Sequence, residues 1–259
     1  MEDLLRLFIV ALVAFSSELI SSVFGGGYGT ILTPTLVLLG YELSLAVPCT
    51  LISQLISGLF LVAFHHRLGT IKVARRSEDV RAAGILALCG LVGVVVAALA
   101  LVSLPAPVVD AYVAIVILTV GLVVLLRRNA RSNPDGPPSL KKLVALGILS
   151  AFNKGISGGG YGPLLSGGQV ASGTGVRSAI GRMLLAEVVV CLGGVMAYAF
   201  LRAPLDLPLV LSATLGSTLM APLSAHAVRR TGEKKLKIGM GLLITALGLA
   251  MMVRVLTSL

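Results

Sequence analysis

Apolar residues run through this chain in long stretches, and the charged residues collect in a few short segments between them. A helix rises about 1.5 Å per residue, so about 20 apolar residues cross the roughly 30 Å hydrocarbon core of a bilayer. Three uncharged stretches reach this length, at residues 44–64, 82–109 and 207–228. The pattern predicts a membrane-spanning helix for each of them.

The remaining apolar segments are shorter or interrupted. Segments 111–126 and 238–253 adjoin basic residues, and segment 183–201 carries Glu187 in its interior. Segments 4–24 and 143–156 each run into a series of glycines and are followed by a short apolar piece, at 28–39 and 161–170. We expect a helix, a break and a half-helix in both places, because the second pieces are too short to cross a bilayer.

The two glycine series are copies of one motif. Gly25-Gly26-Gly27-Tyr28-Gly29 returns as Gly158-Gly159-Gly160-Tyr161-Gly162, an offset of 133 residues in a chain of 259. Each glycine inside a helix costs about 0.8 to 1 kcal/mol relative to alanine, so each motif is expected to break its helix. In membrane transporters, broken helices at matching positions of two halves indicate a substrate site.

Composition independently assigns the chain to the membrane. Hydrophobic residues make up 56% of the chain and charged residues 12%, and the mean hydropathy is +1.00. This leaves too little polar surface for a soluble protein of this size. The cysteines Cys49, Cys89 and Cys191 lie singly, without metal-ligand spacing or a disulfide pattern, so we expect no metal site and no cofactor.

The basic residues predict the orientation. Of 21 lysines and arginines, five lie in each of three segments, at 65–81, 127–142 and 229–237, whereas segments 103–107 and 202–206 carry one between them. The positive-inside rule places the first three segments in the cytoplasm and the other two outside. The net charge of +10 therefore reflects membrane topology and does not indicate a nucleic-acid partner.

This topology makes the two copies inverted. The offset of 133 maps the cytoplasmic segment after His65 onto the outer segment at Arg202. The expected fold is all-α and polytopic, with a first repeat at 1–128, a cytoplasmic linker at 129–140 and an inverted second repeat at 141–259. Each repeat has about five segments and both termini lie outside. The glycine-broken helices would enter from opposite faces and meet near the midplane.

Helix ends at the breaks suggest an anion site. A restarting helix presents unpaired N–H groups and a positive dipole end, which together favour a small oxyanion. The alternative is that the glycines allow close helix crossing and the tyrosines pack. The candidate substrate-binding residues are Gly25, Gly26, Gly27, Tyr28, Gly29, Thr30 and Thr33 in the first motif, and Ser157, Gly158, Gly159, Gly160, Tyr161, Gly162 and Ser166 in the second.

Five ionisable or polar residues extend this hypothesis. Lys154 lies inside an apolar segment four residues before its glycines, and it either contacts the substrate or snorkels to the cytoplasmic interface. Arg182 is either a second substrate contact or an interfacial anchor. Glu18, Gln54 and Glu187 are coupling candidates, and Glu187 is the counterpart of Gln54 under the offset. Glu187 either pairs with Lys154 or Arg182, takes a proton during transport, or is a structural acid.

These residues also carry a family resemblance. The run from Phe24 to Pro34, its partner from Lys154 to Pro163, and His65-His66-Arg67-Leu68-Gly69 resemble the sulfite exporter TauE/SafE family of membrane permeases over essentially the whole chain. The resemblance implies a multi-pass protein of the cytoplasmic membrane that exports small sulfur-containing anions, such as sulfite or sulfoacetate-like organosulfonates. Ser166-Gly167 replaces Thr33-Pro34 in the second copy, which predicts different chemistry in the two halves.

Other classes of function fit less well. The sequence has no metal-spaced His/Glu/Cys set, no Gly-x-Ser-x-Gly elbow and no phosphate-binding loop, so we do not expect an enzyme. Gly27-Tyr28-Gly29 resembles a potassium filter, but such a filter needs four copies in a ring. We expect a secondary transporter that works by alternating access, with an anion channel or a permease for another small anion as the alternative. The expected partners are the anion and the lipid bilayer, and a homodimer is left open.

Overall fold

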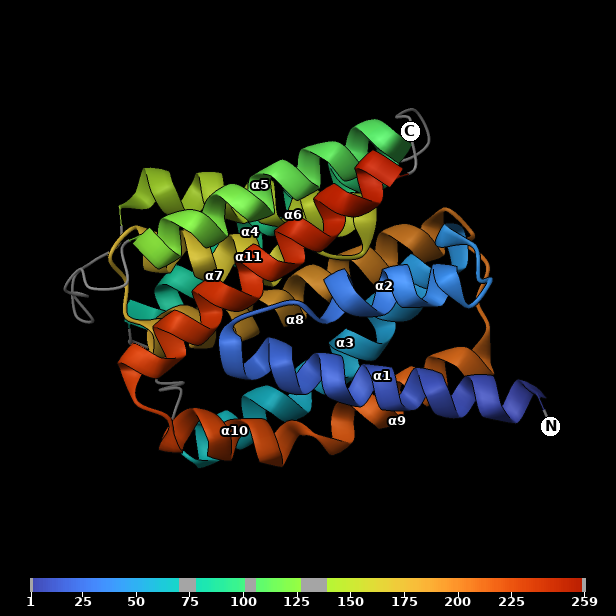
Figure 1. Cartoon of the computed structure of the whole chain (residues 1–259), viewed down its shortest axis with the longest axis horizontal. Coiled ribbons are helices and arrows are strands. Elements are labelled where there is room, and N and C mark those ends of the chain that lie inside the picture. Colours follow the sequence, from blue (N-terminus) through green and yellow to red (C-terminus); the bar gives the residue numbers. More distant parts are fainter. Residues whose placement is uncertain (1, 70–77, 101–105, 127–138, 258–259) are drawn as a thin grey trace.

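The chain folds into packed α-helices, as predicted (Figure 1). A computed structural model describes residues 2–69, 78–100, 106–126 and 139–257, and all regular elements in these ranges are helical. They are α1 (Glu2–Phe24), α2 (Tyr28–Leu38), α3 (Leu43–Arg67), α4 (Glu78–Ala100), α5 (Ala106–Leu126), α6 (Leu140–Ser157), α7 (Tyr161–Ala171), α8 (Val176–Phe200), α9 (Leu207–Leu219), α10 (Ala221–Arg230) and α11 (Glu233–Thr257).

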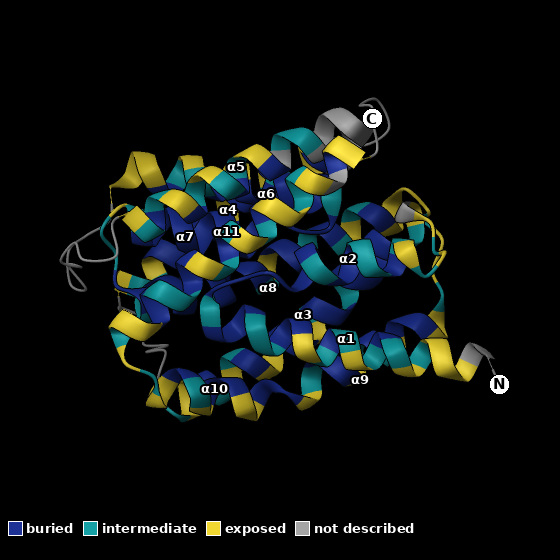
Figure 2. Ribbon diagram, in the orientation of Figure 1, coloured by how far each residue is buried: buried dark blue, intermediate teal, exposed yellow. Residues whose placement is uncertain are grey.

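Several of these segments have the length and apolarity of membrane spans. Within the described ranges there are six: Leu4–Phe24, Ser44–Arg67, Glu78–Ala97, Val176–Phe200, Leu207–Arg230 and Glu233–Thr257. Large apolar side chains of these helices are exposed, for example Phe8, Leu59 and Leu211. Figure 2 colours the exposed residues yellow. Lipid tails, unlike water, solvate such side chains without penalty, so the structure is that of a multi-pass membrane protein.

Both glycine motifs break their helices, as predicted. Gly25, Gly26 and Gly27 have φ values of 83°, 130° and 137°, and Gly158 and Gly160 have φ values of 69° and 75°. Residues with a side chain rarely adopt such angles, which explains why glycines stand there. The helices that restart, α2 and α7, have 11 residues each. They therefore rise about 16 Å, roughly half of the hydrocarbon core.

The helix boundaries follow the sequence repeat. Shifting by 133 residues superimposes both ends of α2 on those of α7 and both ends of α3 on those of α8. The ends of α1 and α6, at Phe24 and Ser157, are related by the same shift. The first turn of α1 and the last turn of α11 lie at the same end of the molecule (Figure 1).

Two predicted segments differ from the structure. The predicted span 207–228 is found as the candidate span Leu207–Arg230, but its helix is divided into α9 and α10 at Met220. Pro222, in the first turn of α10, has no N–H to donate, and its ring clashes with the helical carbonyl four residues earlier, so a continuous helix is interrupted here. The predicted span 82–109 also combines two helices, because α4 ends at Ala100 and α5 begins at Ala106.

Two predicted connections lie mainly outside the described residues. Residues 129–138 of the predicted linker are among those not described, and Leu140 already begins α6. Of the predicted outer segment 103–107, only residues 106 and 107 are described, and they belong to α5.

The two long equivalent helices, α3 and α8, pack against each other at the centre of the molecule. α4 lies against α6, α5 against α11, and α1 against α9. The half-helices α2 and α7 contact the central pair, so the glycine breaks lie beside the α3–α8 crossing.

Candidate functional site

The two glycine motifs touch each other backbone to backbone. A Cβ on Gly26 would collide with the backbone of Gly162, and a Cβ on Gly29 would collide with the carbonyl of Gly158. A Cβ on Gly159 would lie 2.8 Å from the backbone of Thr30. In this conformation the glycines therefore allow the two breaks to approach each other closely. This is the packing role that the sequence analysis gave as the alternative to an anion site.

These contacts are reciprocal under the 133-residue shift. Gly26 faces Gly162, and the shifted pair, Gly159 and Gly29, is also in contact. Reciprocal contacts of this kind are characteristic of a two-fold axis. They fit two repeats related by a two-fold axis, and the inverted orientation of the repeats in the membrane stays a prediction.

The hydroxyl groups beside the motifs follow the same relation in part. The Ser166 hydroxyl donates to the Gly25 carbonyl, and the equivalent Thr33 hydroxyl lies against Gly158. The Gly160 N–H donates to Thr30 Oγ1 at 2.9 Å. The equivalent of Thr30 is Pro163, which has no hydroxyl, so this hydrogen bond is made in one direction only.

A cluster of three polar side chains, Gln54, Lys154 and Glu187, lies at the α3–α8 crossing, and we call it the central cluster. Lys154 Nζ donates to Gln54 Oε1 at 2.5 Å and to Glu187 Oε1 at 2.9 Å. Gln54 Nε2 donates to the same Glu187 oxygen at 2.9 Å. Gln54 and Glu187 are equivalent residues of the two halves, so their contact lies where a two-fold axis would pass.

Lys154 is buried rather than directed to an interface. Its side chain is 1% exposed, and its ammonium lies 5.5 Å from the centre of the Tyr161 ring, a cation–π distance. The ion pair with Glu187 is likewise buried. Of the two partners that the sequence suggested for Glu187, the structure brings Lys154 to it.

A small polar cavity joins the central cluster to the glycine breaks. Its lining includes residues from both motifs, namely Gly27, Tyr28, Gly29 and Thr30 and Gly158, Gly159, Gly160, Tyr161 and Gly162, together with Gln54, Lys154 and Glu187. Its volume is about 10 Å³, close to the least space that holds one water molecule. The Lys154 ammonium is hydrogen-bonded to the Glu187 carboxylate. The cavity leaves no space for an oxyanion beside this ion pair.

The two tyrosines of the motifs differ in their hydrogen bonding. The Tyr28 hydroxyl lies 2.7 Å from Ser53 Oγ, whereas the buried Tyr161 hydroxyl has no hydrogen-bond partner among the described residues. Glu18 is also buried, and its Oε2 has no partner in the same part of the chain. A buried polar group without a partner is costly, which marks these two groups as available to a ligand or a proton.

Several predicted residues lie beside the site without lining the cavity. Thr33 Oγ1 is 3.1 Å from Thr50 Oγ1, and Ser157 Oγ donates to the Asn153 carbonyl at 2.8 Å. Arg182 is not brought to the central cluster, because its Nε donates to Asp79 Oδ1 at 2.7 Å. Among the described residues, no group of three or more His, Cys, Asp or Glu side chains is arranged to hold a metal ion.

Two polar residues were missed by the sequence reasoning. Ser53 is the partner of Tyr28, and Asn153 is buried with neither side-chain amide atom hydrogen-bonded within the described residues. Asn153 precedes Lys154 in an apolar segment, so an intramembrane amide was the available signal.

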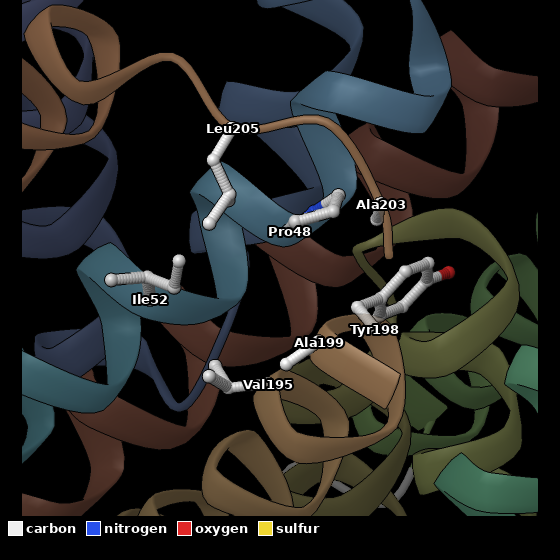
Figure 3. A pocket seen from close by; sticks show the side chains of 7 residues that line it. All are labelled: Pro48, Ile52, Val195, Tyr198, Ala199, Ala203 and Leu205. Atoms are coloured by element: carbon white, nitrogen blue, oxygen red, sulfur yellow. The ribbon is translucent and has the colours of Figure 1, made fainter. Parts of the chain in front are cut away.

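A second cavity lies between α3 and the end of α8 (Figure 3). It measures about 40 Å³, and its lining is apolar apart from Tyr198, as illustrated by Ile52, Val195 and Leu205. The Tyr198 hydroxyl donates to the Gly155 carbonyl at 2.9 Å. This cavity therefore offers an anion no charged partner.

Comparison with known proteins gives two further findings. Residues 9–251 match the family described as "Sulfite exporter TauE/SafE". The Bacillus subtilis (strain 168) protein described as "Probable membrane transporter protein YtnM" is 22% identical over 233 residues, which is 87% of this chain and 75% of that protein.

Proposed function

Because the chain belongs to the sulfite exporter TauE/SafE family of membrane transporters, we propose that it is a secondary transporter of small sulfur-containing anions. The substrates would be sulfite or organosulfonates such as sulfoacetate, moved across the cytoplasmic membrane by alternating access. The observation that carries this proposal is the buried Lys154 ammonium, which faces a cavity made by both glycine breaks.

The cavity chemistry favours an anion. An ammonium inside a membrane protein is costly unless a negative group compensates it, and here the Glu187 carboxylate does so. A sulfite or sulfonate oxygen can accept the same hydrogen bond from Lys154. The Tyr161 hydroxyl and the N–H groups at the starts of α2 and α7 are further donors near the cavity.

The size of the cavity supports a change of conformation during transport. An anion needs more than the space of one water molecule, so the two glycine breaks would move apart and Glu187 would leave Lys154. Rocking of one repeat against the other around the central cluster would open the site to each side in turn. We expect both termini outside, the central linker in the cytoplasm and outward transport.

A channel or a permease for another small anion is the competing function. A channel would conduct at rates far above those of a carrier and would not couple the entry of labelled substrate to the exit of unlabelled substrate. The small volume of the cavity at the central cluster, about 10 Å³, favours a carrier, because it has room for about one water molecule and not for a stream of anions.

The test is transport by the purified protein in liposomes. Liposomes are loaded with unlabelled sulfite, sulfoacetate or sulfate, and the same anion in labelled form is added to the external solution. A secondary transporter is expected to accumulate label by saturable counterflow without ATP, and one sulfur-containing anion should compete with the others. Unsaturable flux, or flux of chloride alone, would contradict the proposal.

The state of assembly, monomer or homodimer, is read from the mass of the detergent-solubilised particle.

A further inference from the structure

The centre of the molecule holds more carboxyl groups than ammonium groups. Glu18 from α1, Lys154 from α6 and Glu187 from α8 are all buried, with exposures of 1%, 1% and 6%. Glu18 lies close enough to interact electrostatically with both of the others. Within the described residues, Lys154 is the one cation of this group. If both carboxyls were ionised, the group would carry an excess negative charge in a membrane interior, which is costly.

Hydrogen bonding distinguishes the two carboxyls. Glu187 Oε1 accepts from both Lys154 Nζ and Gln54 Nε2, which is the environment of an ionised carboxylate. Glu18 Oε2 is buried and accepts from no described group, so ionising Glu18 would leave this oxygen without a hydrogen-bond partner. The neutral arrangement is therefore an ionised Glu187 paired with Lys154 beside a protonated Glu18.

An incoming anion disturbs this balance. It would compete with Glu187 for the same Lys154 ammonium, and the centre would then hold two negative groups and one positive group. We infer that Glu187 takes up one proton when an anion binds to Lys154, so that one proton accompanies each bound anion. This inference rests on the proposed function and identifies the proton as the ion coupled to transport of the anion.

The step is balanced without any other reactant. The Glu187 carboxylate and one proton from water become a carboxylic acid, and the ion pair between Lys154 and Glu187 is replaced by one between Lys154 and the anion. The centre has zero net charge before and after. Protonated Glu187 can still accept from Gln54 Nε2 and can donate its new proton to the bound anion.

Few titratable groups of the neighbouring helices face Glu187. Among the described residues they are Lys154 from α6, Glu18 from α1, Tyr161 from α7 and Cys191 on the next turn of α8. α3 contributes the neutral Gln54, and its His65 lies three turns away against Ser224 of α10. Asp79 of α4 and Glu233 of α11 bind near the start of α8, to Arg182 and to the Val176 N–H. Glu187 is the carboxyl that contacts Lys154.

The test measures protons and binding together on the purified full-length protein. Methanesulfonate is the probe, because it is the anion of a strong acid and any pH dependence then belongs to the protein. A pH indicator in weakly buffered detergent solution should report about one proton taken up per bound anion. Wherever binding takes up one full proton, the affinity should fall by about tenfold for each unit by which the pH is raised.

A matched pair of variants assigns the proton. Glu187→Gln should bind methanesulfonate with an affinity that no longer depends on pH and should take up no proton. Glu42→Gln removes an exposed carboxylate just before α3 and should behave as the wild type. Should Glu187→Gln fail to fold, the proton count of the wild type still decides.

The outcomes separate the inference from the proposed function. Methanesulfonate binding with no proton uptake and no pH dependence overturns the inference and leaves the transporter in place. Binding that requires sodium at constant pH, with no proton uptake, also overturns it. If neither methanesulfonate nor sulfite binds at any pH, the proposed function fails and the inference fails with it.

Discussion

The first and second halves of the molecule share helix boundaries but bury different side chains beside the central cluster. On α3, Ser53, Ser57 and His65 are buried on the face that continues from Gln54. The residues at the equivalent positions of α8 are Ala186, Val190 and Tyr198, which are also buried. The same backbone thus carries hydrogen-bonding groups in one half and mostly apolar groups in the other.

The helices that cover these faces differ in the same way. Ser217 and Ser224, on α9 and α10, are buried, and Ser224 Oγ lies 3.4 Å from His65 Nε2. The equivalent positions in α4 are Gly84 and Leu91, which have no polar side chain. We call Ser53, Ser57, His65, Ser217 and Ser224 the polar seam.

The seam has a physical consequence for solvent access. Parting two helices lets water in at lower cost where buried hydroxyls can hydrogen-bond to it than where apolar side chains line the gap. The polar seam begins beside Gln54 of the central cluster and ends at His65, near the basic end of α3 at Arg67. On the α8 side, Val190 and Tyr198 stand in its place. We therefore expect the central cluster to be hydrated from the His65 end more readily than from the Tyr198 end.

The largest expected effect tests the charge difference between the halves, since Lys154 is the counterpart of the neutral Ser21. Lys154→Ala leaves the buried Glu187 carboxylate without its partner, which should cost about 3 to 5 kcal/mol of stability. Loss of the charge-assisted hydrogen bond should also weaken anion binding by roughly ten- to a hundredfold. Thermal unfolding and methanesulfonate binding measure the two effects.

Two further variants check this result. Lys154→Ala combined with Glu187→Gln removes the unpaired charge and should recover much of the stability but not the affinity. Lys235→Ala, at an exposed lysine, should change neither quantity. If Lys154→Ala left both unchanged, the lysine would have no part in the site.

The next effect tests what the halves have in common, the contact between the glycine breaks. Gly29→Ala and its equivalent Gly162→Ala place a methyl group into the opposite backbone, so each should destabilise the protein by about 1 to 3 kcal/mol. Gly84→Ala is the control, because no atom lies within 4 Å of a Cβ at this helical position. The melting temperature in detergent measures all three. Equal melting temperatures would mean that the two breaks do not pack as described.

A third prediction tests the polar seam directly with a pair of equivalent positions. In a chain whose three cysteines are replaced by alanine, a thiol is introduced by Ser57→Cys or by Val190→Cys. We expect an anionic, membrane-impermeant thiosulfonate to label the Ser57→Cys thiol at least about ten times faster, because thiol reaction requires access to water. Mass spectrometry of the intact protein gives the two rates. Faster labelling at Val190→Cys would reverse the assignment of the hydrated side.

The smallest effect concerns the other end of the central helices, where Tyr198 stands in place of His65. Tyr198→Phe removes the hydrogen bond to the Gly155 carbonyl while keeping the ring in place, so it should cost about 1 kcal/mol. Chemical or thermal unfolding detects this loss. A neutral substitution would indicate that water replaces the hydroxyl at that end.

Much of the fold could be predicted because it depends on local physics. The lengths of the apolar stretches and the energetic cost of consecutive glycines define α1, α2, α6 and α7 without reference to any other part of the chain. The break at Met220 was missed because the stretch carries no charged residue, although Pro222 was a local signal for it. Segment 82–109 was predicted as one span for the same reason, although the outer segment predicted at 103–107 lies within it and marks the boundary between α4 and α5.

The sequence by itself determined that the chain is a helical membrane protein with two copies of a glycine break, and it singled out Lys154 and Glu187 as unusual charges for such an environment. Only the tertiary structure decided which groups meet. Glu187 binds Lys154 and Gln54 whereas Arg182 binds Asp79, and Tyr28 binds Ser53 whereas Tyr161 has no partner among the described residues. The physical reason is that hydrophobic periodicity indicates that a face is buried but does not identify the helix that covers it, and hydrogen bonds between helices depend on the covering helix.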